Sequence, residues 1–366
     1  MQLQQELRSG SYYPSRSICF VVSDPSVREI FAADFKDRIV HHLLVRQIEE
    51  AGERHFIHDS YACRPGKGAH KAVTGLRNFT RKASDNHRRP VFYAQMDISG
   101  FFMNIDHDIL YRIFTRFIKK QKKSRQWKRE MLWLGKVIIF HKPTENYVTK
   151  GNPELLNSIP KRKSLFYSGP GKGLPIGNYS SQFLGNLFLN ELDQFVKREL
   201  KCRYYLRYVD DFIILGRNKH ELRCLSRRID RFLRRELDLE LNPIKTKIRP
   251  VEQGIDFLGY VVKEKYVLVR KRVKKKMKDK ARHIAAHDPL ESLDPWATAR
   301  RQISTLNSYY GHLKHADAQN LKLRVFQKYL MDTRRDIRPA EDFRSLQIKK
   351  DDWNVYMGES CGLVNW

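Results

Sequence analysis

Residues 204–215 read YYLRYVDDFIIL, two apolar runs separated by the adjacent aspartates Asp210 and Asp211. The runs are β-prone, so the stretch predicts two short strands, 203–209 and 212–215, joined by a tight turn. An exposed Asp-Asp hairpin turn is the ordinary alternative, because aspartate favours turns. A turn between buried strands is nevertheless a poor place for two carboxylates unless positive charge lies beside them.

A third carboxylate, Asp97, ends another predicted strand, 91–98, in the run QMDISGFF at 95–102. Two strands of one sheet can place Asp97 beside Asp210 and Asp211. Three close carboxylates repel one another unless divalent cations neutralise them, and hard oxygen ligands suit Mg²⁺ or Mn²⁺. Two such ions about 3.5–4 Å apart support in-line nucleotidyl transfer.

The elements around these strands predict an α+β fold. Helices are expected at 27–50, from the N-cap Asp106 onward, at 179–200 and through 222–232, with a further strand at 257–262. From Lys263 the pattern is mostly helical and very basic, with nine Lys or Arg between Arg270 and Arg282. The middle of the chain is therefore expected to form a mixed sheet backed by helices.

The charge of the chain points to a polyanionic partner. Its 366 residues carry 70 Lys and Arg against 41 Asp and Glu, a formal charge of +29, and nucleic acid is the first expectation. No apolar run approaches the ~18 residues of a membrane-spanning helix, and no signal-peptide pattern is present, so we expect a soluble cytoplasmic protein without a membrane partner. Neither a disulfide framework nor a zinc site is predicted from the five scattered cysteines, Cys19, Cys63, Cys202, Cys224 and Cys361.

Asp97 with Phe102 five residues later, and the Tyr-Val-Asp-Asp run, resemble motifs A and C of reverse transcriptases. The resemblance implies that the three aspartates hold two Mg²⁺ ions, with Mn²⁺ as a substitute. It also implies that Ile98 and Phe102 contact the incoming deoxynucleoside triphosphate, Phe102 as a steric gate against a ribose 2′-hydroxyl. For Phe102 the alternative is a core aromatic beside Phe101.

Further motifs resemble the same family. The run RPGKG at 64–68 is similar to a fingers motif in which Arg64 and Lys67 contact the triphosphate, although a basic surface loop is the alternative. The run DRIV at 37–40 is similar to the motif that opens the fingers. LNPIKTK at 241–247 looks like motif D, with Lys245 as general acid and Lys247 as a close alternative, and FLGY at 257–260 resembles the primer grip, formed by Phe257, Leu258 and Gly259. The basic segment resembles a thumb, whose backbone contacts would come from Lys271, Arg272, Lys274 and Lys275.

The run GLPIGNYSSQ at 173–182 has Ile176 and Gln182 where most intron, retron and viral relatives have Gln and Pro. This departure resembles the pattern of diversity-generating retroelement enzymes, in which Ile176, Gly177, Ser181 and Gln182 would lie by the template and affect fidelity. Such enzymes copy a template-repeat RNA into cDNA with errors opposite adenine, for mutagenic retrohoming into a target gene. The resemblance also implies a bacterial or phage origin and a small basic accessory protein oligomer.

The family resemblance implies a right-hand polymerase fold with fingers at 1–90, a palm of antiparallel sheet backed by helices at 91–262, and a fingers-side insertion around 141–172. A basic helical thumb and C-terminal tail would occupy 263–366. Its partners would be template RNA, the cDNA or primer, and deoxynucleoside triphosphates. Two alternatives stay open: a group II intron-type reverse transcriptase or maturase without an endonuclease domain, and a catalytically silent RNA-binding protein. A two-metal nuclease is disfavoured, because hydrolysis has no use for a steric gate.

Overall fold

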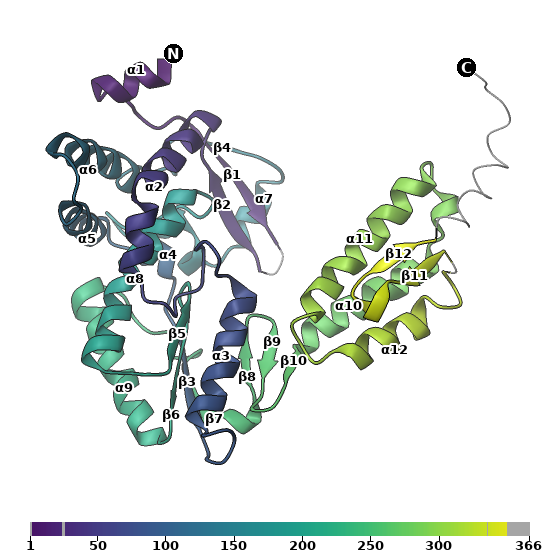
Figure 1. The fold of residues 1–366 in the computed structure, drawn as a ribbon. Helices are drawn as coiled ribbons and strands as arrows, with labels where there is room; N and C mark the ends of the chain where they lie inside the picture. The colour runs from purple at the N-terminus through teal and green to yellow at the C-terminus, as the bar shows by residue number, and fades with distance from the viewer. Residues whose placement is uncertain (1, 24–25, 335, 350–366) are drawn as a thin grey trace, which may run out of the picture. The chain divides into compact units, whose positions relative to one another are not determined.

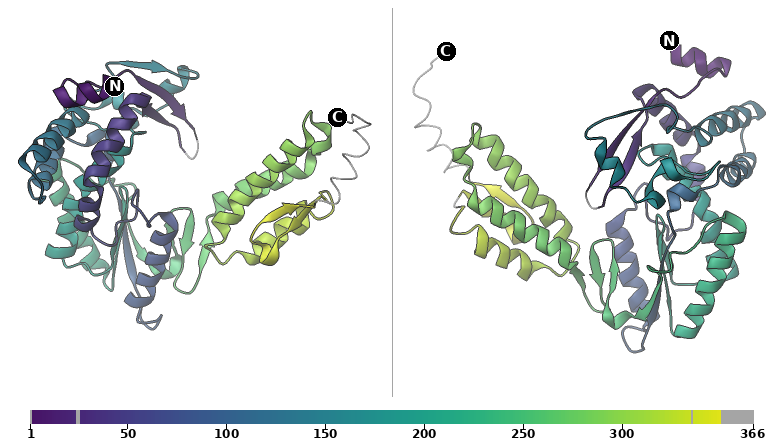
Figure 2. Two further views of the ribbon diagram at one scale, coloured as in Figure 1. Left: turned by 45° about the horizontal axis from the view of Figure 1, so that its top comes forward. Right: turned by 180° about the vertical axis from the view of Figure 1, so that it is seen from behind.

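The computed structural model describes residues 2–23, 26–334 and 336–349, so Cys361 and most of the predicted tail lie outside the described residues. The chain forms two compact units, one of residues 1–75 and 90–250 and the other of 76–89 and 251–366 (Figure 1 and Figure 2). The two units divide at 75/76, 89/90 and 250/251, whereas the predicted fingers, palm and thumb are defined by their roles, with boundaries at 90 and 262. The naming of fingers, palm and thumb therefore remains a prediction.

The first unit is built on a four-stranded antiparallel sheet. Its strand order is β5-β6-β3-β7, and the strands span Tyr205–Tyr208 (β5), Asp211–Gly216 (β6), Phe92–Asp97 (β3) and Lys247–Pro250 (β7). The strand predicted at 91–98 and the two predicted strands around Asp210 are thus confirmed. Strands β3 and β6 pair in register from Phe92↔Gly216 to Asp97↔Asp211. Two of the predicted carboxylates, Asp97 and Asp211, are therefore direct partners on neighbouring strands.

Helices cover this sheet and enclose the main core. The helix α9 (Lys219–Phe232) packs against β3, β6 and β7, and α8 (Tyr179–Gln194) contributes twelve buried residues. The Phe195 and Phe232 rings stack at 4.3 Å between centroids, which joins the ends of the two helices. The other helices of this unit are α1 (Gln2–Ser9), α2 (Phe35–His55), α4 (Phe101–Asn104), α5 (His107–Lys119), α6 (Arg125–Ile139) and α7 (Glu154–Asn157). As predicted, Asp106 caps α5, accepting a hydrogen bond from the amide of Ile109 at 2.9 Å.

A second sheet of the same unit corrects the helix predicted at 27–50. Strands β1 (Ser17–Val22) and β2 (Arg28–Ala32) form an antiparallel hairpin, and β4 (Tyr147–Thr149), from the predicted insertion, pairs parallel to β1. Ile30 and Phe31 therefore lie in a strand. The helix begins only at Phe35, where the Asp34 side chain caps it. The short apolar run before it fits the spacing of a helix as well as that of a strand, and its pairing in the hairpin makes it a strand.

The second unit has its own core and two small sheets. Its helices are α10 (Lys271–Ala286), α11 (Pro295–Leu313) and α12 (Gln319–Tyr329), and α3 (Ala69–Ala83) is shared between the units. Its strands are β8 (Ile255–Phe257), β9 (Tyr260–Val262), β10 (Val267–Val269), β11 (Ile337–Pro339) and β12 (Leu346–Ile348). The single strand predicted at 257–262 was wrong: Leu258 and Gly259 both have positive φ, and they form the turn of a hairpin between β8 and β9.

The architecture confirms the predicted α+β class, an antiparallel sheet backed by helices, with further helices in a separate unit. Four of the cysteines, Cys19, Cys63, Cys202 and Cys224, are free thiols. Within the described part of the chain, no helix is both long enough and apolar enough to cross a membrane.

Candidate active site

The three predicted aspartates meet at one end of the four-stranded sheet. Asp97 is the last residue of β3 and pairs in register with Asp211, the first residue of β6. Asp210 occupies the turn between β5 and β6, after Val209, whose φ is +54°. Strand register thus places Asp97 beside Asp211, and the turn adds Asp210 next to them; all three carboxylates are half-buried.

The electrostatics of these carboxylates favour a bound cation. Burial, followed by the charge of Asp97, raises the pKa of Asp210 to about 6. Burial also raises the pKa of Asp211 to about 7, with smaller contributions from Asp210 and Asp97 and against the hydrogen bonds from Gln95. A divalent cation would relieve this repulsion, and an all-carboxylate donor set suits Mg²⁺ or Mn²⁺. Over the described residues no three His, Cys, Asp or Glu side chains form a ready-made cage, so substrate or water oxygens would have to complete the coordination.

Lys245 is the basic residue at this carboxylate cluster. Its Nζ lies 2.8 Å from Oδ2 of Asp97. The backbone amide of Asn242 donates a hydrogen bond to the Asp97 carbonyl oxygen at 2.7 Å. Lys245 lines the same cavity as Asp97 and Asp210, whereas Lys247 lies in β7 and does not line it. Of the two motif D lysines, Lys245 is therefore the one at the site.

A cavity of about 390 Å³ opens beside the aspartates. Ile98 and Phe102, the predicted nucleotide-contacting residues, line it together with Asp97 and Asp210. Gly100 shapes this wall: its φ is +54°, and a Cβ there would lie 2.9 Å from the carbonyl oxygen of Arg162. Only glycine fits both constraints, so the insertion can pass close over the start of α4.

Three cations that the sequence reasoning missed line this cavity: Arg28, Arg162 and Lys163. Arg28 opens β2, while Arg162 and Lys163 lie in the insertion between β4 and α8. The signal that would have found them, a KRK run at 161–163, is weak in a chain with 70 Lys and Arg. Their position depends on Gly100 and on the docking of the insertion, which no local pattern specifies.

Arg64 and Lys67, predicted to contact the triphosphate, do not line the cavity. The Arg64 side chain is 4% exposed and donates to both carboxylate oxygens of Glu53 and to the carbonyls of Ile57 and Ser60. Lys67 donates to the His58 carbonyl at 2.8 Å. Arg64 thus holds its own loop together, and the structure does not bring these two residues to the three aspartates.

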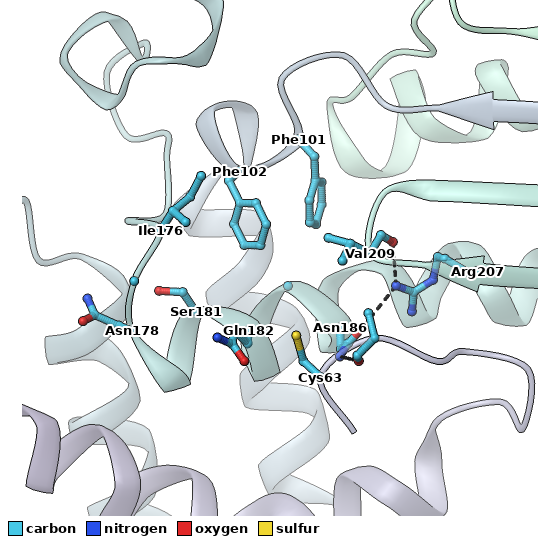
Figure 3. Close-up of a pocket in the computed structure, with 13 residues that line it drawn as sticks. Cys63, Phe101, Phe102, Ile176, Asn178, Ser181, Gln182, Asn186, Arg207 and Val209 are labelled. Carbon is cyan, nitrogen blue, oxygen red and sulfur yellow. Dashed lines mark hydrogen bonds between the residues drawn. The ribbon is translucent and has the colours of Figure 1, made fainter. Parts of the chain in front are cut away.

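The predicted fidelity residues gather around a smaller pocket of about 170 Å³ (Figure 3). Ile176, Gly177, Ser181 and Gln182 line it with Phe102, and Ile176 and Phe102 also line the larger cavity. The segment before α8 therefore lies at a pocket that both Phe102 and Val209, the residue before the two aspartates, also line.

This segment is fastened to β2 through its backbone. The Phe31 amide donates to the Ile176 carbonyl at 2.9 Å, and Gly177 has a φ of +130° with no room for a Cβ, which would lie 2.9 Å from the Phe31 carbonyl oxygen. The Asn178 side chain accepts a hydrogen bond from the Ala33 amide at 3.1 Å. These contacts give a physical reason for glycine at 177.

The remaining predicted residues belong to the second unit. Phe257 is fully buried, and Leu258 and Gly259 form the β8–β9 turn. Lys271, Arg272, Lys274 and Lys275 are exposed residues in the first turns of α10, whose buried residues are Met277, Ala281 and Ile284. Their contacts with primer or template remain predictions.

Comparison with known proteins agrees with this geometry. The family model for reverse transcriptase (RNA-dependent DNA polymerase) matches residues 23–262. Protein YkfC of Escherichia coli is 25% identical over 304 residues, covering 74% of this chain and 71% of that protein. The group II intron-encoded protein LtrA of Lactococcus lactis is 23% identical over 71% of this chain, and the matched region spans about half (49%) of LtrA.

A solved structure shows the same fold. Apo telomerase from Candida tropicalis superposes with a TM-score of 0.51 at 12% identity, covering 87% of this chain and 57% of that one. The family match spans both the strand carrying Asp97 and the turn carrying Asp210 and Asp211. The chain therefore belongs to the reverse transcriptase family, the RNA-dependent DNA polymerases.

Proposed function

We propose that this chain copies RNA into DNA by two-metal nucleotidyl transfer at Asp97, Asp210 and Asp211. The observation that carries the proposal is the in-register pairing of Asp97 with Asp211, with Asp210 in a cavity shared with Phe102. When bound, the two Mg²⁺ ions would activate the primer 3′-hydroxyl and stabilise the leaving pyrophosphate. The chain's own residues orient the substrates around them.

The walls of the cavity fit a deoxynucleoside triphosphate. Arg28, Arg162 and Lys163 offer positive charge to the triphosphate, Phe102 closes the side on which a 2′-hydroxyl would project, and Lys245 can donate a proton to the departing pyrophosphate from its place beside Asp97. A silent RNA-binding protein would need neither a gate nor three intact carboxylates. We therefore favour the enzyme over the binding protein.

At the finer level, we propose an enzyme of the diversity-generating kind, error-prone opposite adenine. Support comes from Ile176 and Gln182, which replace the usual Gln and Pro and line the pocket behind Phe102. A changed side chain here alters the surroundings of the nascent base pair. A template-repeat RNA, a basic accessory oligomer and a target gene belong to this proposal.

A group II intron-type enzyme is the second candidate, favoured by the similarity to LtrA. The name of LtrA links that protein to an intron. The mitochondrial nuclear intron maturase 1 of Arabidopsis thaliana, 22% identical over 66% of this chain, also favours this candidate. Ile176 and Gln182 are the residues that speak for the first candidate.

Primer extension on an RNA template with Mg²⁺ tests the general proposal. We expect cDNA from the wild-type chain, and its absence both with and without an added accessory protein would contradict the polymerase assignment. Sequencing the cDNA tests the finer proposal, which requires errors opposite adenine to exceed those opposite the other bases. An Ile176→Gln, Gln182→Pro double variant should lower that excess, whereas equal error rates at all template bases in the wild type would favour the intron-type enzyme.

A further inference from the structure

Arg207 is a fully buried arginine in the strand that leads into the catalytic turn. Both its side chain and that of Asp193 are 0% exposed, and they form a two-bond ion pair at 2.8 and 2.6 Å. Tyr205, on the same face of β5, donates its hydroxyl to Asp193 at 2.6 Å. Buried ion pairs of this kind are often replaceable by apolar side chains without loss of stability, so folding alone gives a weak reason for this one.

The third nitrogen of the guanidinium reaches the catalytic turn. Nη1 donates to the carbonyl oxygen of Val209 at 2.9 Å and to Oδ1 of Asn186 at 3.2 Å, as the dashed lines in Figure 3 show. Val209 directly precedes Asp210, so the Val209 carbonyl belongs to the peptide unit that carries the Asp210 amide. Asp193 fixes the guanidinium plane, and the guanidinium in turn fixes that peptide.

Val209 needs such a hold because its backbone is strained. A φ of +54° lies in the left-handed region, where a β-branched residue is a genuine outlier. Strained backbone persists only when its surroundings over-determine it. In the described structure, the Arg207 bond is a direct side-chain contact to that residue's carbonyl.

The same arginine ties the turn to the loop before the RPGKG run. The Arg207 amide donates to the Asp59 carbonyl, and its carbonyl accepts from the Tyr61 amide, both at 2.9 Å. Asn186 extends the connection, since its Nδ2 donates to the Ala62 carbonyl at 2.9 Å. The loop, α8 and the turn are thus joined at one residue.

Resting on the proposed polymerase function, we propose that Arg207 is a positioning residue: anchored by Asp193, it holds the strained Val209 peptide and so sets where the Asp210 and Asp211 carboxylates lie. In this role Arg207 acts through the peptide and not by contact with substrate. Its loss should lower kcat and weaken metal binding while leaving nucleotide and template binding unchanged, because displacements of about 1 Å in an active site can cost 10²-fold in rate.

The first test compares Arg207→Lys with Tyr205→Phe. Lysine keeps the buried charge but has no planar fork to hold Asp193 and Val209 together, so we expect kcat per titrated active site to fall at least about tenfold. The KM for deoxynucleotide and the Kd for template-primer should stay within twofold of wild type. Tyr205→Phe removes another bond to Asp193 and should keep wild-type kcat. A folded Arg207→Lys enzyme with kcat within twofold of wild type overturns the proposal.

The second test uses the strain at Val209. In the Arg207→Lys background, Val209→Gly should restore part of kcat, because glycine adopts a positive φ without strain. Val209→Ala removes nearly the same side chain but keeps most of the penalty, and it should restore less. Equal effects of the two substitutions would mean that Arg207 does not act through this peptide.

A third readout does not depend on polymerase activity. Mn²⁺ binding, followed by electron paramagnetic resonance of the free ion, should be weaker in Arg207→Lys than in wild type or Tyr205→Phe. Unchanged Mn²⁺ affinity in Arg207→Lys overturns the positioning role, whether or not the wild-type chain extends a primer. Failure of the wild-type chain to extend a primer would count against the proposed function alone. If Arg207→Lys does not fold, a triple variant replaces the buried group with apolar side chains: Asp193→Leu, Tyr205→Phe and Arg207→Met. This triple variant should bind Mn²⁺ more weakly than the wild-type chain does.

Discussion

The two walls of the active-site cavity are built in opposite ways. The acidic wall comes from strand ends: Asp97 ends β3, and Asp210 lies in the turn just before Asp211, which pairs in register with Asp97. The basic wall comes from other segments, with Arg28 at the start of a hairpin strand and Arg162 and Lys163 in the insertion. Two strand ends thus set the place of the acidic groups, whereas the charge proposed to bind a substrate comes from longer, more adaptable side chains.

The largest expected effect is on the acidic wall. Asp210→Asn keeps the size of the side chain but removes the charge that would bind a cation. We expect primer extension to fall by more than about 10²-fold, because even outer-shell changes at metal sites cost 10–100-fold. Asp108→Asn, an exposed aspartate in the first turn of α5, is the matched control. Equal extension rates for Asp210→Asn and wild type would remove the acidic wall from catalysis.

The basic wall should affect binding more than chemistry. Replacing both Arg162 and Lys163 with alanine should raise the KM for deoxynucleotide at least about tenfold, since a charge-assisted hydrogen bond contributes about 1.5–3 kcal/mol. Lys161→Ala is the control, because its Nζ lies over the Tyr167 ring and it does not line the cavity. If Lys67→Ala raises KM and the double variant does not, the triphosphate contacts the RPGKG loop instead.

Phe102 lines the cavity together with both walls, and its substitution should change selectivity. Phe102→Ala should raise the efficiency of ribonucleotide incorporation relative to deoxynucleotide by roughly tenfold, the scale of a steric pocket change. Phe114→Leu, at a ring that is 0% exposed in the core and lines neither cavity, should leave the ratio unchanged. Competition assays with labelled nucleotides measure both ratios, and an unaltered ratio in Phe102→Ala would make Phe102 a core residue.

The acidic wall should bind metal less well as the pH falls. The raised pKa values, about 6 for Asp210 and about 7 for Asp211, mean that protons occupy these carboxylates in the metal-free protein below neutrality. Protons then compete with the cation, so Mn²⁺ affinity should fall by up to about tenfold per pH unit between pH 7 and 5 for each carboxylate. Titrations at pH 8, 7, 6 and 5 measure this, and a flat profile would contradict the shared burial of the two groups.

The exposed cations of α10 should give the smallest effect. Lys271→Ala and Lys274→Ala should each lower the slope of log affinity against log salt by roughly one for a template-primer duplex, with little change in kcat. Lys119→Ala, at the end of α5 in the first unit, is a charge-matched control. A slope unchanged by the α10 variants would assign backbone contacts to other parts of the chain.

The acidic wall could be read from the sequence because strand spacing and turn position determine it. Asp97 and the Asp210-Asp211 pair each end a β-prone run, so the sheet leaves few ways to place them. The start of α2 could not be read in this way, since Ile30 and Phe31 suit a helix as well as a strand. The β8–β9 turn was missed because Leu258 is a poor signal for a left-handed residue.

The basic wall could not be predicted for a different reason. A Lys or Arg in this chain carries little information, because every region contains many. Arg64 matched a family motif, yet the structure gives its guanidinium to Glu53 and two carbonyls. Which cations face the cavity depends on long-range packing, such as the passage of the Arg162 carbonyl over Gly100, and only the folded chain shows it.

The hydrogen bond from the Phe31 amide to the Ile176 carbonyl has an evolutionary consequence. It makes the position of the segment beside Phe102 a property of β2 and, through its pairing, of β1. Substitutions in that hairpin at positions other than Arg28 can therefore shift Ile176 without changing a residue proposed to contact a nucleotide. With the fidelity role proposed for Ile176, selection can then adjust how faithfully the enzyme copies at sites remote from the copied base, while the three aspartates and the rate of bond formation stay as they are.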